Sequence, residues 1–403
     1  MKRFLLSLLF VTAACRRTPT GRADAMLAGE IDKIQAIDNH AHPVAPGGDA
    51  PDRDYDALPV EQLEASLDPV RLRRGALAIR EAHRALGEDR NNPARVLDHA
   101  GIGIMIANRV AVGKGLPADR FKWAAYVDAL MYPLDNTALA VNSDRKAFFT
   151  LEEKLLARYY RESGVASKPR SLDEYLHKVV SPTLERHKQA GALAEKFEMA
   201  YLRSLAVTNP TAAEAQAAWS GKGDYKVLQD YLFRYIATEC GRLGMAVHIH
   251  TGAGGGGYFD IAGSKPELLE PLFNDPSLRK INFVMLHGGW PYSATITPLL
   301  SKPNAWVDFS FQGMVLSREE LAASLRTWLE YVPEHILFGT DAYPYSPELG
   351  WQEAAVASAQ KGRDALGVAL TQMMRDNEID QDRAVELAKM VLRDNARKLY
   401  GMK

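Results

Sequence analysis

Near its start the chain reads Ala36-Ile37-Asp38-Asn39-His40-Ala41-His42-Pro43. The run is mostly apolar before the first histidine and ends at a proline, which predicts a short buried strand that stops at a loop. Residues two apart on a strand point to the same side. The imidazoles of His40 and His42 therefore project together from the strand end, in a geometry that suits one metal ion.

Three later segments repeat this pattern, and each predicts an apolar strand followed by a metal-capable side chain and a turn. The segments are residues 245–252, 281–289 and 335–342. In a (β/α)8 barrel the carboxyl ends of all strands open into one shared site. His250, His287 and Asp341 would then lie beside the two histidines of the first strand. The predicted fold class is therefore α/β, a (β/α)8 barrel of the TIM type.

This pattern resembles the amidohydrolase superfamily, and within it the amidohydrolase-2 branch. That superfamily carries His-x-His on strand 1, a histidine on each of strands 5 and 6, and an aspartate on strand 8. The resemblance covers about residues 30 to 400, including the closing stretch 391–400. The metal ligands that it implies are His40, His42, His250 and Asp341.

The resemblance also implies catalytic roles. Asp341 is expected to act as general base on a water molecule, and His287 to polarise the substrate carbonyl or to bind a second metal. Lys196 lies on the expected strand 4, where some members carry a carboxylated lysine that bridges two metals, so it is a candidate for a second metal or for substrate. His248 lies one pleat deeper than His250, which favours a core position or a role in supporting a ligand.

Imidazole and carboxylate ligands suit zinc or another divalent transition metal, and we expect one ion rather than two. Such an ion lowers the pKa of a water ligand to about 7. The function that we infer is a metal-dependent hydrolase that cleaves an amide, ester or lactone bond in a small molecule. Two alternatives stay open: a non-oxidative decarboxylase, because that branch uses the same ligands, and a ligand-binding lipoprotein without catalysis.

The charge balance bounds the class of partner. The chain has 403 residues and a formal net charge of −1. A balanced charge gives no reason to expect nucleic acid as a partner, so we expect a small-molecule substrate. The sequence leaves the oligomeric state open.

The N-terminus predicts export. Two basic residues precede the apolar run 4–14, which is typical of a secretory signal and too short to span a membrane. Thr12-Ala13-Ala14-Cys15 resembles a bacterial lipobox, which implies lipidation of Cys15 and membrane attachment; the alternative is cleavage at Ala23-Asp24-Ala25. Either way we expect the protein in the periplasm, free or anchored to a membrane as a lipoprotein.

The expected organisation is a signal peptide (1–15), a polar linker (16–28) and one barrel (29–403) that contains a helical insertion at 136–190. The expected strands are residues 34–39, 101–107, 121–130, 195–201, 245–250, 281–286, 304–311 and 335–340, followed by helices over 351–400. Cys240 has only Cys15 as a potential partner, so we expect a buried thiol rather than a disulfide.

Overall fold

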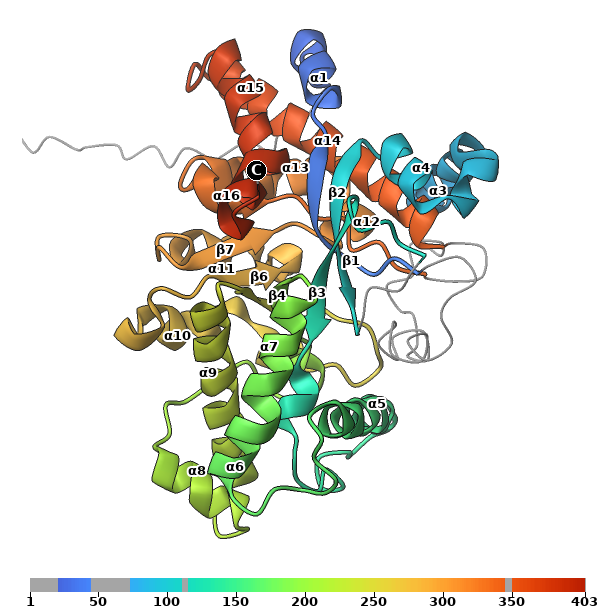
Figure 1. Cartoon of the computed structure of the whole chain (residues 1–403). Coiled ribbons are helices and arrows are strands. Elements are labelled where there is room, and N and C mark those ends of the chain that lie inside the picture. Colours follow the sequence, from blue (N-terminus) through green and yellow to red (C-terminus); the bar gives the residue numbers. More distant parts are fainter. Residues whose placement is uncertain (1–20, 45–72, 111–114, 345–349, 403) are drawn as a thin grey trace, which may run out of the picture.

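The computed structural model describes residues 21–44, 73–110, 115–344 and 350–402. Eight parallel strands form one sheet in sequential order, from β1 to β8 (Figure 1). The strands are β1 (Ala36–Ala41), β2 (Ile102–Arg109), β3 (Phe121–Tyr126), β4 (Ala192–Phe197), β5 (Ala246–His250), β6 (Phe283–Leu286), β7 (Ala305–Asp308) and β8 (Ile336–Leu337).

Backbone hydrogen bonds between β1 and the segment after β8 close this sheet into a barrel. Asn39 N donates to Phe338 O over 2.8 Å, and His42 N donates to Ala342 O over 2.7 Å. The predicted (β/α)8 barrel is therefore confirmed. Closure also brings the carboxyl end of the first strand next to the segment that carries Asp341, although the two are far apart in the sequence.

The barrel interior is filled by side chains from every strand. This cluster contains Ile37, Ile106, Ala124, Ala194, Ala246, Val284, Leu286, Trp306 and Leu337. Strands of a parallel barrel are buried on both faces, which explains why they read as continuous apolar runs in the sequence. The interior is a packed core rather than a pore.

Helices surround the barrel. They are α1 (Ala25–Asp32), α3 (Arg73–Leu86), α4 (Pro93–His99), α5 (Ser143–Glu162), α6 (Leu172–Tyr175), α7 (Ser181–Gln189), α8 (Ala212–Trp219), α9 (Tyr225–Leu243), α10 (Glu270–Asn274), α11 (Ser293–Leu299), α12 (Gln312–Val315), α13 (Arg318–Leu329), α14 (Trp351–Arg375), α15 (Gln381–Lys389) and α16 (Asn395–Tyr400). Two π-helical turns, Leu176–Val180 and Met390–Asp394, lead into α7 and α16.

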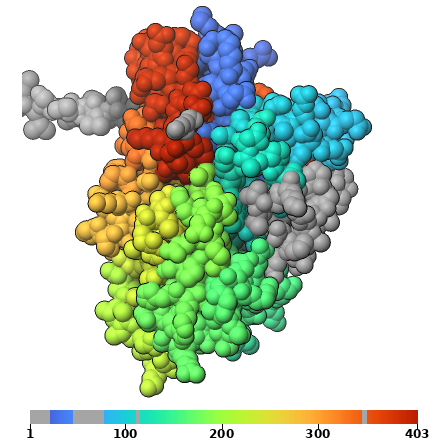
Figure 2. Space-filling model, viewed as in Figure 1, coloured from blue at the N-terminus to red at the C-terminus, as the bar shows by residue number. Residues whose placement is uncertain are grey.

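The segment 136–190 is largely helical. It contains α5, α6 and α7, which lie between β3 and β4 in the sequence. In Figure 2 the green surface of this region forms the lower part of the molecule together with α8 and α9. The extra helices are therefore gathered at one end of the barrel.

Several predicted boundaries differ from the structure. The predicted strand 121–130 ends at Tyr126, and Asp128–Met131 form a 3-10 turn. Strand β4 begins three residues before the predicted 195, and the last predicted strand residues, Met199–Tyr201, form a 3-10 turn. Residues 25–28, expected in the polar linker, begin α1, because the Asp24 carboxylate caps that helix by accepting from Met26 N and Leu27 N.

The predicted signal segment, including Cys15, lies outside the described residues. Within the part that the structure describes, helices that are both long and apolar enough to cross a membrane are absent. Cys240 is buried in α9 as a free thiol.

Candidate metal centre

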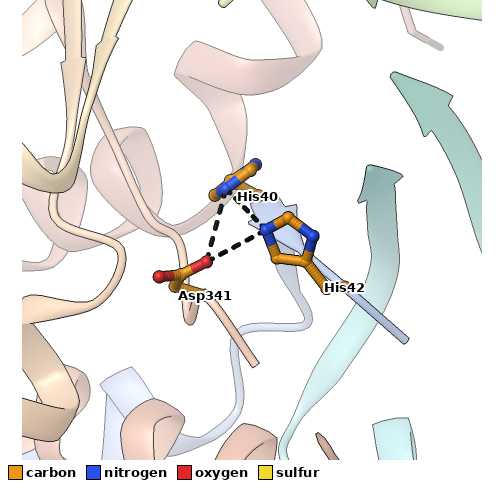
Figure 3. Close-up of side chains that lie close together, drawn as sticks. All are labelled: His40, His42 and Asp341. Carbon is orange, nitrogen blue, oxygen red and sulfur yellow. Dashed lines mark hydrogen bonds and ion pairs between the residues drawn. The ribbon is translucent and has the colours of Figure 1, made fainter. Parts of the chain in front are cut away.

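Three donor atoms meet at the carboxyl end of β1. His40 Nε2 lies 3.2 Å from His42 Nε2, and both nitrogens lie 3.3 Å from Asp341 Oδ1. Figure 3 shows the three side chains pointing toward one another: His40 comes from β1, His42 directly follows that strand, and Asp341 lies in the segment after β8. All three are buried. The structure therefore brings together the His-x-His pair and the aspartate that the sequence predicted.

These separations fit a bound metal ion. Zinc–nitrogen and zinc–oxygen bonds are about 2.0–2.1 Å long, which places tetrahedral ligand atoms about 3.3 Å apart. Two imidazole lone pairs and a carboxylate oxygen at such distances repel one another unless a proton or a cation lies between them. The donor set, two imidazoles and one carboxylate, is also one that zinc and similar ions prefer.

The backbone at the centre is locally strained. His287 and Asp341 have φ angles of 65° and 52°, in the left-handed region that non-glycine residues rarely adopt. Each such residue costs on the order of 1–3 kcal/mol. Hydrogen bonds hold both in place, since Asp341 N donates to His40 O over 2.8 Å and His287 N donates to Asp308 Oδ1 over 2.9 Å.

Asp38 and Thr340 tie the two strand ends together beneath the centre. Asp38 Oδ1 accepts from Thr340 N over 3.0 Å and from His40 N over 3.2 Å. Burial raises the pKa of Asp38 to about 7, against the lowering effect of these bonds. The alternation of polar residues on β1 thus supplies the support as well as the ligands.

Burial keeps the imidazoles of His40, His250 and His287 neutral. It holds the pKa values of His40 and His287 well below the usual range, and with the charge of Lys196 it lowers the pKa of His250 to about 3. Burial raises the pKa of Asp341, but the neighbouring His287, His40 and His42 outweigh it, so that pKa stays well below normal. His40, His250 and His287 therefore offer neutral nitrogens to a cation, and Asp341 offers an ionised carboxylate.

Tyr126 supports His42. Its hydroxyl lies 2.9 Å from His42 Nδ1 and can accept the Nδ1 proton, which leaves the lone pair on Nε2 for a metal. The sequence analysis missed Tyr126, although it is the last residue of β3 and therefore stands at the same end of the barrel.

His287 is held by a serine. Ser310 Oγ lies 3.0 Å from His287 Nδ1 and donates its own proton to Asp308 Oδ1 over 2.7 Å. Because that hydroxyl proton is committed, Nδ1 must donate to Ser310, and the lone pair resides on Nε2. Neutral His287 therefore suits a ligand or a hydrogen-bond acceptor. The predicted roles of His287, in polarising the substrate carbonyl or in binding a second metal, stay predictions.

His250 stands beside the group of three. Its ring centroid lies 4.5 Å from that of His287 and 4.7 Å from that of Tyr201. Its Nε2 is buried without a hydrogen-bond partner, as expected for an atom that awaits a ligand. The role of His250 as a metal ligand stays a prediction.

Lys196 and His248 have other partners. Lys196 Nζ forms an ion pair with Glu198 Oε1, and its role at a second metal or in substrate binding stays a prediction. Glu198 Oε2 also lies 3.5 Å from His250 Nδ1. Glu198 was not predicted from the sequence, although it directly follows β4, at the same end of the barrel as the other site residues. His248 Nε2 contacts Tyr400 Oη over 2.6 Å, which places His248 in the core below the centre.

Solved structures share this fold. A protein from Lactobacillus casei described as a metal-dependent hydrolase matches with a TM-score of 0.68 and 17% identity, over 94% of this chain and 98% of that one. Glucuronate isomerase from Caulobacter crescentus matches with 0.63 and 15%, over 94% and 93%. Uronate isomerase from Thermotoga maritima matches with 0.61 and 13%, over 93% and 96%. At these identities the likeness concerns the fold.

Comparison of the sequence with known families identifies the family as well as the fold. No curated relative matches the chain. The sequence pattern of the amidohydrolase-2 family, described as amidohydrolase, matches residues 192–402, which is more than half of the chain and includes His250, His287 and Asp341. The chain belongs to the amidohydrolase family.

Proposed function

We propose that this protein is a metal-dependent hydrolase that cleaves an amide, ester or lactone bond in a small molecule. The observation that carries the proposal is the convergence of His40 Nε2, His42 Nε2 and Asp341 Oδ1, at 3.2–3.3 Å from one another. Membership of the amidohydrolase family supports a metal-dependent reaction.

These three residues would hold the ion, with His250 as a further ligand from β5. When bound, a divalent ion of this kind lowers the pKa of water to about 7 and polarises a carbonyl group. Asp341 Oδ1 lies 3.3 Å from Nε2 of both His40 and His42, and Asp341 Oδ2 lies 3.7 Å from His287 Nδ1. Zinc is the ion we propose, as one equivalent.

Asp341 is the proton carrier in this proposal. Its low pKa keeps it ionised at neutral pH, so it can accept a proton from water and return it to the leaving group. His287, neutral and with its lone pair on Nε2, accepts a hydrogen bond from the substrate or completes a second metal site. Burial of these groups excludes bulk water and strengthens each electrostatic contact.

Isotope labelling identifies the reaction class. The zinc-loaded protein is incubated in H₂¹⁸O with a panel of lactones, esters, amides, aromatic acids and uronates, and the products are weighed by mass spectrometry. We expect a lactone, ester or amide to gain one ¹⁸O-labelled water, and we expect Asp341→Asn to abolish this gain. Loss of 44 mass units as carbon dioxide, or conversion without a change of mass, would overturn hydrolysis in favour of decarboxylation or isomerisation. Substrate binding without turnover would favour the ligand-binding lipoprotein.

Export is a separate proposal that rests on the sequence of residues 1–25. We expect the mature protein to begin at Cys15 and to carry a diacylglyceryl group. Mass spectrometry of the N-terminal peptide from bacterial membranes checks this, with Cys15→Ser as the matched control. A mature N-terminus after Ala25 supports export without lipidation, and an intact Met1 in the cytoplasmic fraction contradicts export.

A further inference from the structure

The C-terminal helix closes the end of the barrel opposite the metal centre. Leu399, Tyr400 and Met402 pack against the apolar cluster inside the strands. Figure 1 shows α16, in dark red, beside the barrel at the C-terminus. Tyr400 also makes polar contacts in the barrel interior: its hydroxyl contacts the side chains of His248 on β5 and Asn39 on β1.

One continuous path of hydrogen bonds leads from this tyrosine to His287. Tyr400 Oη donates to Asn39 Oδ1, and Asn39 Nδ2 donates to Asp308 Oδ2 over 2.8 Å. The other oxygen, Asp308 Oδ1, accepts from His287 N over 2.9 Å and from Ser310 Oγ over 2.7 Å. The path thus joins α16, β1, β7 and the loop after β6.

The hydrogen bonds on this path determine which atom carries each proton. Tyr400 donates to Asn39, so its oxygen accepts from His248 Nε2–H, and His248 Nδ1 then carries a lone pair. That nitrogen is buried without a partner. At the far end Ser310 Oγ donates to Asp308, so His287 must carry its proton on Nδ1. Burial raises the pKa of Tyr400 and thereby keeps the phenol protonated.

We propose that Tyr400 is a positioning residue for the metal centre: from the closed end of the barrel it orients Asn39 and Asp308 and thereby fixes the ring and tautomer of His287. Asn39 directly precedes His40 on β1, so the same contact steadies the strand end that carries the His-x-His pair. The effect on His287 stands on geometry alone, while the consequence for zinc binding rests on the proposed function.

Removal of one oxygen atom tests this. Tyr400→Phe keeps the ring that fills the barrel but deletes the donor to Asn39. Tyr175→Phe is the matched control, because Tyr175 is also buried and its hydroxyl also donates one hydrogen bond, to Leu130 O over 2.8 Å, outside the path. The deciding readout is the imidazole spectrum of metal-free protein labelled with ¹⁵N-histidine, since long-range ¹H–¹⁵N correlations report which ring nitrogen carries the proton.

We expect His287 to show a single Nδ1–H form in the wild type and in Tyr175→Phe. In Tyr400→Phe we expect shifted His287 signals with both tautomers populated, and His248 released from its Nε2–H form. Zinc affinity, measured by competition with a chromophoric chelator, should fall about 10-fold in Tyr400→Phe, as is typical when a partner of a ligand is lost.

An unchanged His287 spectrum in Tyr400→Phe overturns the proposal, as does an equal change in Tyr175→Phe. Failure of the wild type to bind zinc would refute the proposed function instead, and it would leave the comparison of the metal-free spectra intact.

Discussion

Asp128 is a buried carboxyl group that contacts the backbone of Glu198, next to the candidate site. It is fully buried, and its Oδ2 accepts from Glu198 N over 2.6 Å while its Oδ1 has no hydrogen-bond partner. Burial, together with the nearby charge of Glu198, raises the pKa of Asp128 to about 8. The group is therefore largely protonated at neutral pH and behaves as a neutral amide would.

Asp128→Asn should accordingly change the pH dependence of stability. The folded pKa lies above the unfolded value of 3.8, so the wild type holds its full stability below about pH 4 and loses it as the pH rises toward 8. The variant lacks this loss. The difference in free energy of unfolding, variant minus wild type, should therefore rise by at most about 1.4 kcal/mol per pH unit across that window.

Urea unfolding of both proteins at pH 5 and pH 8 measures this difference. Asp382→Asn, at an exposed residue of α15, is the control and should show a much smaller change between the two pH values. If wild type and Asp128→Asn differ in free energy of unfolding by the same amount at both pH values, Asp128 is not protonated in the folded protein.

At this scale the sequence predicted the side chains that carry a recognisable pattern. His40, His42 and Asp341 were predicted because an alternating pair and a strand-end aspartate are local signals, and the barrel places such ends together. Tyr126 and Glu198 were missed, because a tyrosine or a glutamate after a strand looks like an ordinary packing or surface residue until its partner across the barrel is known.

At the scale of elements, the loops after β5 and β6 are in close backbone contact. Gly252 has a φ of 78°, and a Cβ there would lie 2.2 Å from Trp290 O and 2.5 Å from Gly289 C. Ala253 N donates to Trp290 O over 2.6 Å. The glycine is therefore required by close backbone approach, and it fixes the loop after β6, which begins at His287.

Gly252→Ala should destabilise the protein by about 3 kcal/mol, because it adds backbone strain and a clash with main-chain atoms that cannot move aside. Gly164→Ala is the matched control: its φ is 68° but a Cβ would meet no atom within 4 Å, so only about 1 kcal/mol of strain is expected. Urea unfolding measures both. Equal losses in the two variants would contradict the close contact of the loops.

The strands themselves were predictable because apolar runs that end in polar residues mark them clearly. Strand β4 was placed late, because the predicted strand began at Glu195 and left out residues 192–194. The strand carries the charged pair Glu195 and Lys196, whose burial depends on partners elsewhere in the chain. Glu195 pairs with His187 of α7, over 3.0 Å, and Lys196 pairs with Glu198. Periodicity alone does not reveal such compensation.

At the scale of the whole molecule, the site forms only when the barrel closes. The His-x-His pair comes from the first strand and Asp341 from the segment after the last one, and backbone hydrogen bonds join them. A bound ion would therefore link the two ends of the sheet. We expect zinc to stabilise the folded protein, because a ligand that binds only the native state adds RT ln(1 + [L]/Kd) to its stability.

Zinc titration of the metal-free protein by calorimetry tests the account most directly, with His42→Ala, Asp341→Ala and the control His99→Ala, whose imidazole contacts Asp89 away from the site. We predict one equivalent of zinc for the wild type and for His99→Ala. Loss of a ligand should weaken binding by more than the roughly 10–100-fold that loss of a ligand's hydrogen-bond partner costs. Wild-type protein that binds no zinc, or equal binding by His42→Ala and the control, would contradict a metal centre at His40, His42 and Asp341.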